Sequence, residues 1–298
     1  MDLSYWDTIR SMEPDLVIMM GDNVYGRKSS LKEEYQKLKS HASFRRAQDE
    51  LCILAALDDN DYYHGGGGGG GGATSCESPA EEAVALFQEF FRPTLVSNSG
   101  TYQAYQWTDQ LQILVLDLRS FSSPRLPGNE PGMHLAPDYH DKTKTWLGKE
   151  QWLWLEKELD NNVKLRIIIS PLQVLSTGHS FDCWHQLPYE RMRLLKLLKS
   201  NSNNSNSNNN KRATVLLSGD RHVSALYCQD GQYEITSSSL THTVPFGGLK
   251  DENDVTRQSP FVYENNFGML ELGQDPIRAT IVSAHAGEIL QQWHLPVA

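Results

Sequence analysis

The sequence of 298 residues has no long hydrophobic run and no excess of positive charge. No stretch approaches the ~20 consecutive apolar residues that a membrane-spanning helix needs, so the sequence predicts no membrane span. The N-terminal segment MDLSYWDTIRSMEP lacks the basic and apolar regions of a signal peptide, which favours a soluble protein. The formal net charge of −10 argues against a general nucleic-acid binder, because such proteins are usually basic.

Cysteine is scarce, and two common catalytic motifs are missing. The four cysteines form no Cys-x-x-Cys pair, so free thiols in a reducing compartment are the simpler interpretation. His179, Cys183 and His185 are spaced closely enough for zinc but lack a fourth ligand, which makes a structural zinc site the less favoured alternative. Neither GxxxxGK[ST] nor GxSxG occurs, which excludes a P-loop nucleotide site and the nucleophile elbow of serine hydrolases.

Two low-complexity segments interrupt an otherwise ordinary globular composition of 39% hydrophobic and 21% charged residues. The glycine run at 65–72 and the Asn/Ser tract at 200–210 cannot bury apolar surface, so we predict flexible surface insertions. The glycine run matches GxGxxG only because a homopolymer matches any glycine pattern, and we reject it as a nucleotide loop. Since no boundary signal is present, residues 1–298 are interpreted as one domain.

Strand and helix patterns alternate along the first two thirds of the chain. Apolar runs predict strands at 15–21, 52–58, 101–107, 111–118, 165–170, 213–218, 232–237, 267–272 and 277–283. Helical periodicity predicts helices at 31–51, 79–91, 149–160 and 188–199. Almost all of the sequence after the Asn/Ser tract is predicted as strand, so mixed sheets covered by helices are the expected α/β architecture.

Three of the predicted strands end in acidic residues. The continuous apolar run 16–19 is typical of a strand buried on both faces, and it leads to Asp22. The segment ILAAL leads to Asp58-Asp59-Asn60-Asp61, and TVLLSG leads to Asp220-Arg221-His222. A single aspartate at a strand end is more often a helix cap or a turn residue, and for each strand that alternative stays open.

A metal centre explains three acidic strand ends together better than three separate caps do. In an extended segment, the spacing of Asp220 and His222 would send both side chains to the same side. Carboxylates with one imidazole suit Zn, Mn, Fe or a mixed pair of metals. Two such ions about 3.5–4 Å apart can clamp a phosphate and lower the pKa of a bound water.

The order of the motifs resembles that of the PhoD-like (alkaline phosphatase D-like) metallophosphatases of the calcineurin-like superfamily. The resemblance extends over nearly the whole chain and rests on nine segments, which are WDTIRSMEPDLVIMMGDNVYG, LDDND, LVLDLRS, KEQWLWLEKEL, IIISPLQVLS, CWHQLPYER, LLSGDRH, EITSSSLTH and NFGMLEL. It implies a four-layer α/β/β/α sandwich of two mixed sheets. It also implies hydrolysis of phosphoric mono- or diesters by a metal-bound hydroxide, with two divalent or mixed-valence ions drawn from Fe, Ca, Zn and Mn.

The resemblance further assigns metal ligands by position. Asp22 is similar to the bridging aspartate of the family motif GDxxY, and Tyr25 to the tyrosine that can ligate iron. Asp59 matches the ligand position of the family's DDHD segment. Asp220 and His222 match the ligands of SGDxH. The substrate is expected to be a small phosphorylated molecule, and the oligomeric state is left open.

Other family positions imply contacts with the substrate. Arg119 matches a plausible phosphate contact, with a surface ion pair as an equally favoured alternative. Asn23, His179 and His242 lie in segments that would face the substrate, although each histidine is also a reasonable loop residue. Asn60 stands where the family has a histidine that serves as general acid, and asparagine cannot carry that proton at neutral pH.

One family element is expected to be missing. Family members usually begin with a strand that ends in a GSC-type segment and supplies ligands to one metal, so the resemblance predicts an N-terminally truncated domain. The cellular location is therefore left open. The alternative function is a catalytically impaired PhoD-like fold that binds a phosphorylated ligand or a partner protein.

Overall fold

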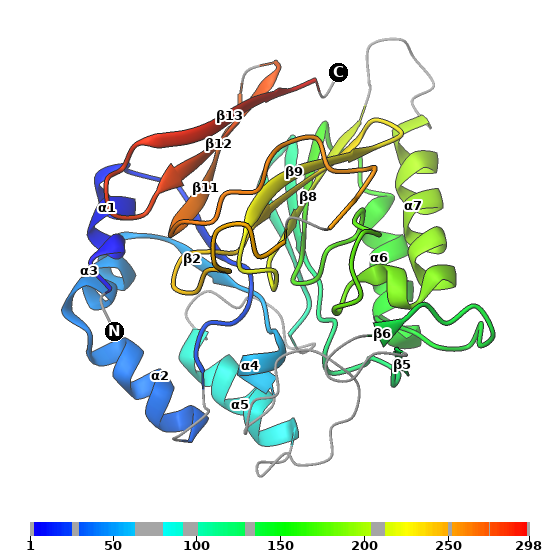
Figure 1. Ribbon diagram of the computed structural model, residues 1–298, viewed down its shortest axis with the longest axis horizontal. Coiled ribbons are helices and arrows are strands. Elements are labelled where there is room, and N and C mark those ends of the chain that lie inside the picture. The colour runs from blue at the N-terminus through cyan, green and yellow to red at the C-terminus, as the bar shows by residue number, and fades with distance from the viewer. Residues whose placement is uncertain are drawn as a thin grey trace.

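The chain folds into four layers in the order α/β/β/α, which confirms the fold class expected from the sequence (Figure 1). The computed structural model describes residues 3–25, 30–62, 80–91, 101–128, 135–203, 212–249, 252–273 and 275–296. The glycine run predicted as an insertion lies outside these ranges, as does the Asn/Ser tract beyond its first residues. In the described part of the chain, none of the helices has the length and apolar character needed to cross a bilayer.

A six-stranded mixed sheet forms the first β layer, with strand order β3-β4-β7-β8-β10-β9. Its strands are β3 (Gln103–Thr108), β4 (Leu111–Val115), β7 (Leu165–Ser170), β8 (Ala213–Ser218), β9 (Ser224–Gln229) and β10 (Gln232–Ser237). The four strands β4, β7, β8 and β10 run parallel to one another, and the edge strands β3 and β9 are antiparallel to their neighbours. A separate two-stranded hairpin joins β5 (Leu126–Pro127) to β6 (Leu135–Ala136).

Successive side chains of this sheet alternate between two hydrophobic cores, as the period of a β-strand requires. Leu114, Ile168 and Leu216 pack against α6 (Gly148–Leu159) and α7 (Pro188–Asn203) on one face. The residues on either side of them in each strand point to the other face and pack against the second β layer. Both faces of the sheet are therefore buried, which explains why its central strands contain continuous apolar runs.

The second β layer consists of two smaller sheets. One is the parallel pair β1 (Val17–Met19) and β2 (Ile53–Ala55). The other is the antiparallel triple β11 (Asn266–Glu271), β12 (Ile277–Ser283) and β13 (Ile289–Leu295). The outer face of the second β layer is covered by a layer of helices, seen at the left and bottom of Figure 1. This layer contains α1 (Tyr5–Ser11), α2 (Leu31–Ser40), α3 (Ala42–Glu50) and α5 (Ala80–Phe91), while α4 (Asp59–Tyr62) is a short turn after β2.

The structure corrects several details of the predicted elements. The helix predicted at 31–51 is divided by His41, whose backbone is extended, into α2 and α3. Helix α7 continues to Asn203, so the start of the Asn/Ser tract is helical and only its later part remains a predicted insertion. The strand at 17–19 is half-buried and not buried on both faces, because one of its edges borders a cavity. Strands β9 and β13 and helices α1 and α4 were missed.

Candidate active site

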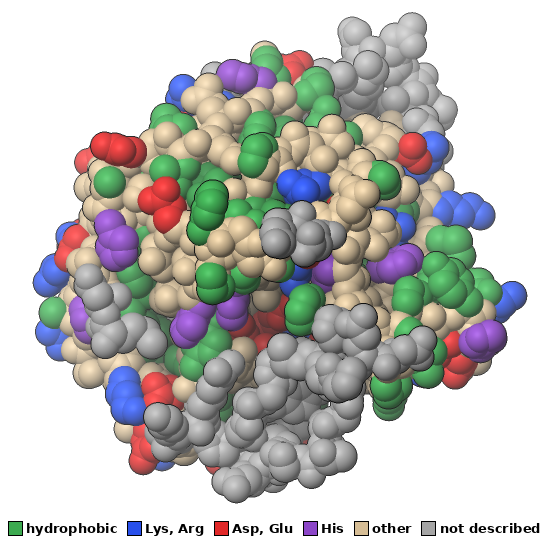
Figure 2. Space-filling model, viewed as in Figure 1, with side chains coloured by type: hydrophobic (Ala, Val, Ile, Leu, Met, Phe, Trp, Pro, Cys, Tyr) green, Lys and Arg blue, Asp and Glu red, His purple; other side chains and the backbone are tan. Residues whose placement is uncertain are grey.

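The acidic strand ends predicted from the sequence meet at one edge of the two β layers. Asp22 follows β1, Asp59 begins α4 after β2, and Asp220 with His222 follows β8. Ligand atoms of Asp22, Asp58 and Asp59 all lie within 4.8 Å of one another. Figure 2 shows acidic side chains gathered beside histidines near the centre of this face. The carboxyl ends of parallel strands thus bring together residues that are almost 200 positions apart.

The backbone at these positions is strained. Asp22, Asp220 and His222 have φ values of 53°, 65° and 54°, a left-handed conformation that residues other than glycine rarely adopt. Gly21 has a φ of 106°, and a Cβ atom there would lie 2.4 Å from Cβ of Asp58. The extended Asp-x-His geometry expected from the sequence is therefore wrong. Asp220 and His222 line the same cavity because both lie in a turn.

Asp22 is the centre of the hydrogen-bond network. Its carboxylate accepts hydrogen bonds from Tyr25 Oη at 3.0 Å and Asn60 Nδ2 at 3.0 Å. Nε2 of His222 lies 3.9 Å from Oδ2 of Asp22 and 3.5 Å from the Tyr25 hydroxyl. Burial favours a higher pKa for Asp22, but hydrogen bonds from His222, Asp59, Asn60 and Tyr25 outweigh it and hold the pKa at about 2. Asp22 is therefore an anion at neutral pH.

Arg119 joins the two β layers through a buried ion-pair network. Its Nε donates to Oδ1 of Asp58 at 2.6 Å, and its Nη1 donates to Oδ2 of Asp182 at 2.8 Å. Nη2 lies 3.6 Å from Oδ1 of Asp220 and makes no hydrogen bond within the described residues. The arginine is only 2% exposed, so the alternative of a surface ion pair is wrong. Arg125 binds Asp182 from the other side, with Nε 3.0 Å from Oδ1.

Asp58, Asp61 and Asp182 were not assigned as site residues from the sequence. Asp61 accepts hydrogen bonds from the backbone and side-chain amides of Asn23 and from the hydroxyl of Tyr35. Asp58 and Asp61 belong to the acidic segment after β2, which was the signal that could have found them. No comparable signal marks Asp182, because only the fold brings it beside Arg119.

The charge balance of the cluster fits a cation. Burial raises the pKa values of Asp58, Asp59 and Asp220, and the charge of Asp22 raises all three further, while Arg119 opposes the shift. Oδ2 of Asp58 is buried without a hydrogen-bond partner in the described part of the chain. Buried carboxylates of this kind need a counter-charge, and their hard oxygens, with the imidazole of His222 nearby, suit Zn, Mn or Fe. The residues present therefore fit a divalent metal.

Residues 29–275 match the sequence model of the PhoD-like phosphatase family. The chain belongs to that family. The match includes Asp59, Arg119, Asp220 and His222, whereas Asp22 and Tyr25 precede it. Comparison with curated protein sequences gives no significant match.

Solved structures show the same fold. The structure of PhoD superposes with a TM-score of 0.73 at 16% sequence identity, covering 98% of this chain and 67% of PhoD. The structure described as "GAP50 the anchor in the inner membrane complex of Plasmodium" superposes with a TM-score of 0.59 at 14% identity, covering 99% and 82% of the two chains. At these low sequence identities, the superpositions establish only that this PhoD-like protein shares the fold.

One further residue of the predicted site, His242, comes from a loop beside the acids. The ring of His242 packs on that of Tyr25 with centroids 4.2 Å apart and lies 5.6 Å from the ring of His222. The structure thus brings His242 into the predicted site. Its Nδ1 lies 2.9 Å from the hydroxyl of Thr241.

His179 is placed differently. Its Nε2 lies 2.9 Å from Oε1 of Gln173, and its Nδ1 accepts a hydrogen bond from the amide of Phe181. Burial and the charge of Arg221 lower its pKa, so the ring is neutral. Within the described residues, Cys183 bonds Gln186 and forms no ligand cluster with His179 and His185, so the zinc alternative has no support there.

Proposed function

We propose that this protein hydrolyses phosphoric esters in a metal-dependent reaction at the cluster around Asp22. The observation that carries the proposal is the approach of the Asp22, Asp58 and Asp59 carboxylates to within 4.8 Å of one another beside a buried arginine. Asp22, Asp59, Asp220 and His222 would hold the metal, with Tyr25 and Asp58 as further oxygen donors. The number and identity of the ions remain part of the proposal, with Fe, Ca, Zn and Mn as candidates.

A bound divalent cation would neutralise part of the acidic cluster, polarise a phosphate ester and lower the pKa of water. The chain itself supplies orientation and charge. Arg119 is held rigidly by Asp58 and Asp182, and its Nη2 has no hydrogen-bond partner in the described residues. Because Nη2 is buried and faces Asp220, Arg119 would act in place through its positive charge beside the carboxylates, and a phosphate oxygen would reach its N–H group only after a rearrangement. A direct contact between Arg119 and phosphate stays a prediction of the family resemblance.

Asn60 and Asn23 position other groups. Nδ2 of Asn60 donates to Oδ1 of Asp22 and to Oδ1 of Asp59, both at 3.0 Å, so the amide orients two proposed ligands. Nδ2 of Asn23 donates to the carbonyl of Ala56 and to Asp61. Neither amide can protonate a leaving group. A candidate for that proton is the imidazole of His242, whose ring lies 5.6 Å from that of His222.

The test is the isosteric substitution Asp22→Asn. It removes a charge from the centre of the cluster, so we expect loss of bound metal and of phosphatase activity while the protein remains folded. Asp15→Asn, an exposed change at the opposite end of β1, is the matched control and leaves both unchanged. Metal content is measured by elemental analysis and activity with an aryl phosphate. Unaltered metal content in folded Asp22→Asn would overturn the proposed site.

A binding function is the second candidate, and the position of Asn60 favours it. The PhoD-like fold here lacks a histidine where the resemblance implies a general acid, and a protein of similar fold is described as an anchor. The two candidates differ in how activity depends on the leaving group. If the protein is an enzyme impaired at this step, Asn60→His should speed hydrolysis of esters with basic leaving groups, up to the ~10²–10⁴ that general acid catalysis supplies. Absence of activity in both metal-loaded forms would favour the binding function.

A further inference from the structure

The turn after β8, which carries Asp220 and His222, has a strained backbone. Asp220 and His222 have φ values of 65° and 54°, in the left-handed region. The amide of Arg221 donates to the carbonyl of Gly219 at 2.9 Å, so Asp220 is the centre of a three-residue turn with positive φ, a rare and strained form. Strain of this kind persists only where the surrounding structure over-determines it. The contacts that hold this turn therefore matter for the position of both side chains.

Backbone hydrogen bonds fix the two ends of this turn. At its start, the amide of Gly219 donates to the carbonyl of Pro171 at 2.9 Å. At its end, the amide of His222 donates to Oγ of Ser238 at 3.0 Å. Arg221 lies between these two ends, and its side chain supplies a further attachment at the middle of the turn.

The side chain of Arg221 forms a buried ion pair with Glu252. Nη2 of Arg221 donates to Oε2 of Glu252 at 2.5 Å, and both side chains are only 6% exposed. The ring of Phe181 also contacts the guanidinium group, with its centroid 5.0 Å from Cζ. Because an arginine side chain has many rotamers in solution, contacts of this kind are needed to fix it in one place.

The segment 252–258 that carries Glu252 is attached to the edge strand β9. The amide of Cys228 donates to the carbonyl of Thr256 at 2.8 Å, and the amide of Gln258 donates to the carbonyl of Leu226 at 2.8 Å. These bonds continue the sheet pairing along β9. Glu252 therefore connects the turn after β8 to a fixed support about 30 residues away in the sequence.

Arg221 acts on its neighbours through position and not through its charge. Burial and the charge of Asp58 raise the pKa of Asp220, and the cation that lowers it is Arg119. The charge of Arg221 is instead neutralised by Glu252. The pair rests on one hydrogen bond, since Nε of Arg221 and Oε1 of Glu252 have no hydrogen-bond partner within the described residues. A single substitution can therefore break it.

We propose that Glu252 is a positioning residue, which holds the turn of Asp220 and His222 in its strained conformation through the side chain of Arg221 and so sets the affinity for metal. This role rests on the proposed function, because Asp220 and His222 are two of the proposed ligands. Neither Glu252 nor Arg221 would touch the metal or the substrate. Groups that orient metal ligands from behind typically contribute about 10–100-fold to metal affinity.

The first measurement uses the metal-free full chain and does not depend on the proposed function. Glu252→Gln keeps the shape of the side chain but removes its charge. Amide hydrogen exchange is followed at Arg221 and His222, whose N–H groups donate hydrogen bonds in the turn, and at Ile168 in the buried core, which reports global unfolding. Relative to any change at Ile168, we expect exchange at Arg221 and His222 to become about tenfold faster or more.

Glu190→Gln is the matched control. Glu190 is 8% exposed, and its Oε2 accepts hydrogen bonds from Nε1 of Trp152 at 2.7 Å and from the amide of Trp146 at 3.1 Å. It lies in α7, away from the turn. The control also removes the charge of a buried glutamate, so it should destabilise the fold without any selective change at Arg221 and His222.

The second measurement is the affinity of the full chain for Mn²⁺ alone. Free Mn²⁺ is counted by electron paramagnetic resonance at a temperature at which every variant is folded. We expect Glu252→Gln to weaken binding about tenfold or more and Glu190→Gln to leave it unchanged. In a chain that already carries Arg221→Met, Glu252→Gln should add little further loss, because the connection to the turn is already absent.

Three outcomes would overturn the positioning role. The first is unchanged relative exchange at Arg221 and His222 in Glu252→Gln. The second is faster exchange there with unaltered affinity for Mn²⁺. The third is a full additional loss of affinity from Glu252→Gln in the Arg221→Met chain, which would exclude a route through Arg221.

Failure of the proposed function gives a different result. If the unaltered chain binds no Mn²⁺, the proposed metal site is wrong, and exchange in the metal-free protein then decides by itself whether Glu252 holds the turn. Should Glu252→Gln fail to fold, Arg221→Lys takes its place. It keeps a charge opposite Glu252 but loses the planar group that contacts Phe181, so the same effects should appear at smaller size.

Discussion

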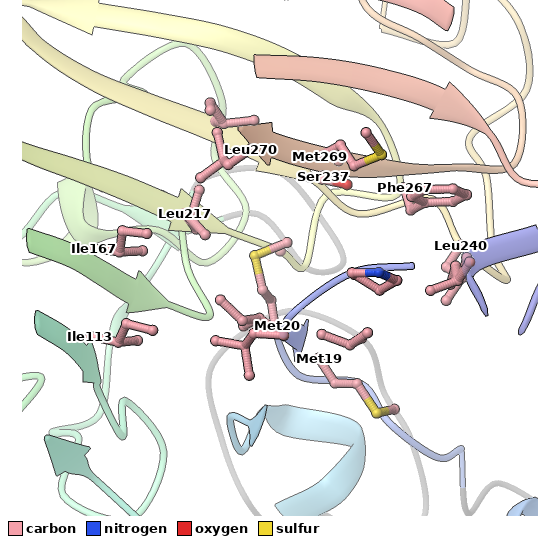
Figure 3. Close-up of a pocket in the computed structure, with 18 of the residues that line it drawn as sticks. Met19, Met20, Ile113, Ile167, Leu217, Ser237, Leu240, Phe267, Met269 and Leu270 are labelled. Carbon is pink, nitrogen blue, oxygen red and sulfur yellow. The ribbon is translucent and has the colours of Figure 1, made fainter. Parts of the chain in front are cut away.

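The two β layers contain similar apolar sequences but differ in how completely their strands are paired. In the six-stranded sheet, β4, β7 and β8 each have a strand on both sides, and Ile168 of β7 is fully buried. In the second layer, β1 has β2 on one side and a cavity of about 920 Å³ on the other (Figure 3), and Ile18 is half-buried. Burial of an apolar run is thus decided by its neighbours in space. The acidic cluster lies where the six-stranded sheet meets the second β layer.

The largest effect is expected at Arg119, which connects the two layers. Arg119→Met leaves Asp58 and Asp182 buried without their shared cation, and breaking a buried ion pair typically costs about 3–5 kcal/mol. The control is Arg125→Met, which removes a partner of Asp182 at a more exposed position and should cost less. Urea denaturation of both variants measures the free energy of unfolding. Equal losses would show that Arg119 does not hold the layers together.

The comparison becomes sharper with one substitution made in each layer. Ile168→Ala removes a side chain from a closed core and should destabilise the fold by about 2–5 kcal/mol. Ile18→Ala borders a space that already exists, so we expect a loss below about 2 kcal/mol. Thermal or urea unfolding gives both values. A loss at Ile18 as large as that at Ile168 would mean that the cavity between β1 and β11 is filled in solution.

A smaller effect concerns the pH dependence of the metal-free protein. Burial and the charge of Asp22 raise the pKa of Asp61 to about 7, against the opposing hydrogen bonds from Asn23, Asp58 and Tyr35. Between the ordinary aspartate pKa and pH 7, the folded state keeps a proton that the unfolded state has released. The contribution of Asp61 to the free energy of unfolding is therefore complete below pH ~4. It is lost as the pH rises through 7, by no more than about 1.4 kcal/mol per pH unit.

Asp61→Asn removes this titration, so its melting temperature should depend less on pH between 5 and 8 than that of the unaltered chain. The measurement is a series of thermal melts in a chelator. Metal should oppose the trend, because the ligands bind it in their deprotonated form. An unchanged pH profile in Asp61→Asn would remove Asp61 as the source.

The smallest effect is expected in the Asn/Ser tract that follows α7. Because the helix continues to Asn203, a deletion should begin at Asn204, and replacing 204–209 with a short linker should barely change the melting temperature. Loop length contributes only ~0.6 kcal/mol per doubling to closure. A deletion that starts at Ser200 removes helical residues and is the contrasting variant. A large loss from the shorter deletion would contradict a simple insertion.

The sequence by itself determined many of the local elements and the acidic residues at three strand ends. Strands β7, β8, β10 and β12 occupy the residues predicted for them, and in β7 and β8 the side chains that face two cores give apolar runs. Asp22, Asp220 and His222 could be placed at strand ends for the same reason. Strands β9 and β13 were missed, although β3 and β11, which also have a single neighbour in their sheets, were predicted; β13 (ILQQWHL) contains no apolar run.

Only the tertiary structure decided which distant groups meet. The burial of Arg119 between Asp58 and Asp182, and the packing of His242 on Tyr25, depend on contacts between segments 60 to more than 200 residues apart. The cavity between β1 and β11 likewise follows from the spacing of two sheets and not from any motif. Hydrophobic periodicity reports the two faces of one element, whereas charge pairing, strain and cavities arise from the packing of several elements. For this reason the positions of the acidic strand ends could be predicted from the sequence, but the electrostatics of the cluster that they form could not.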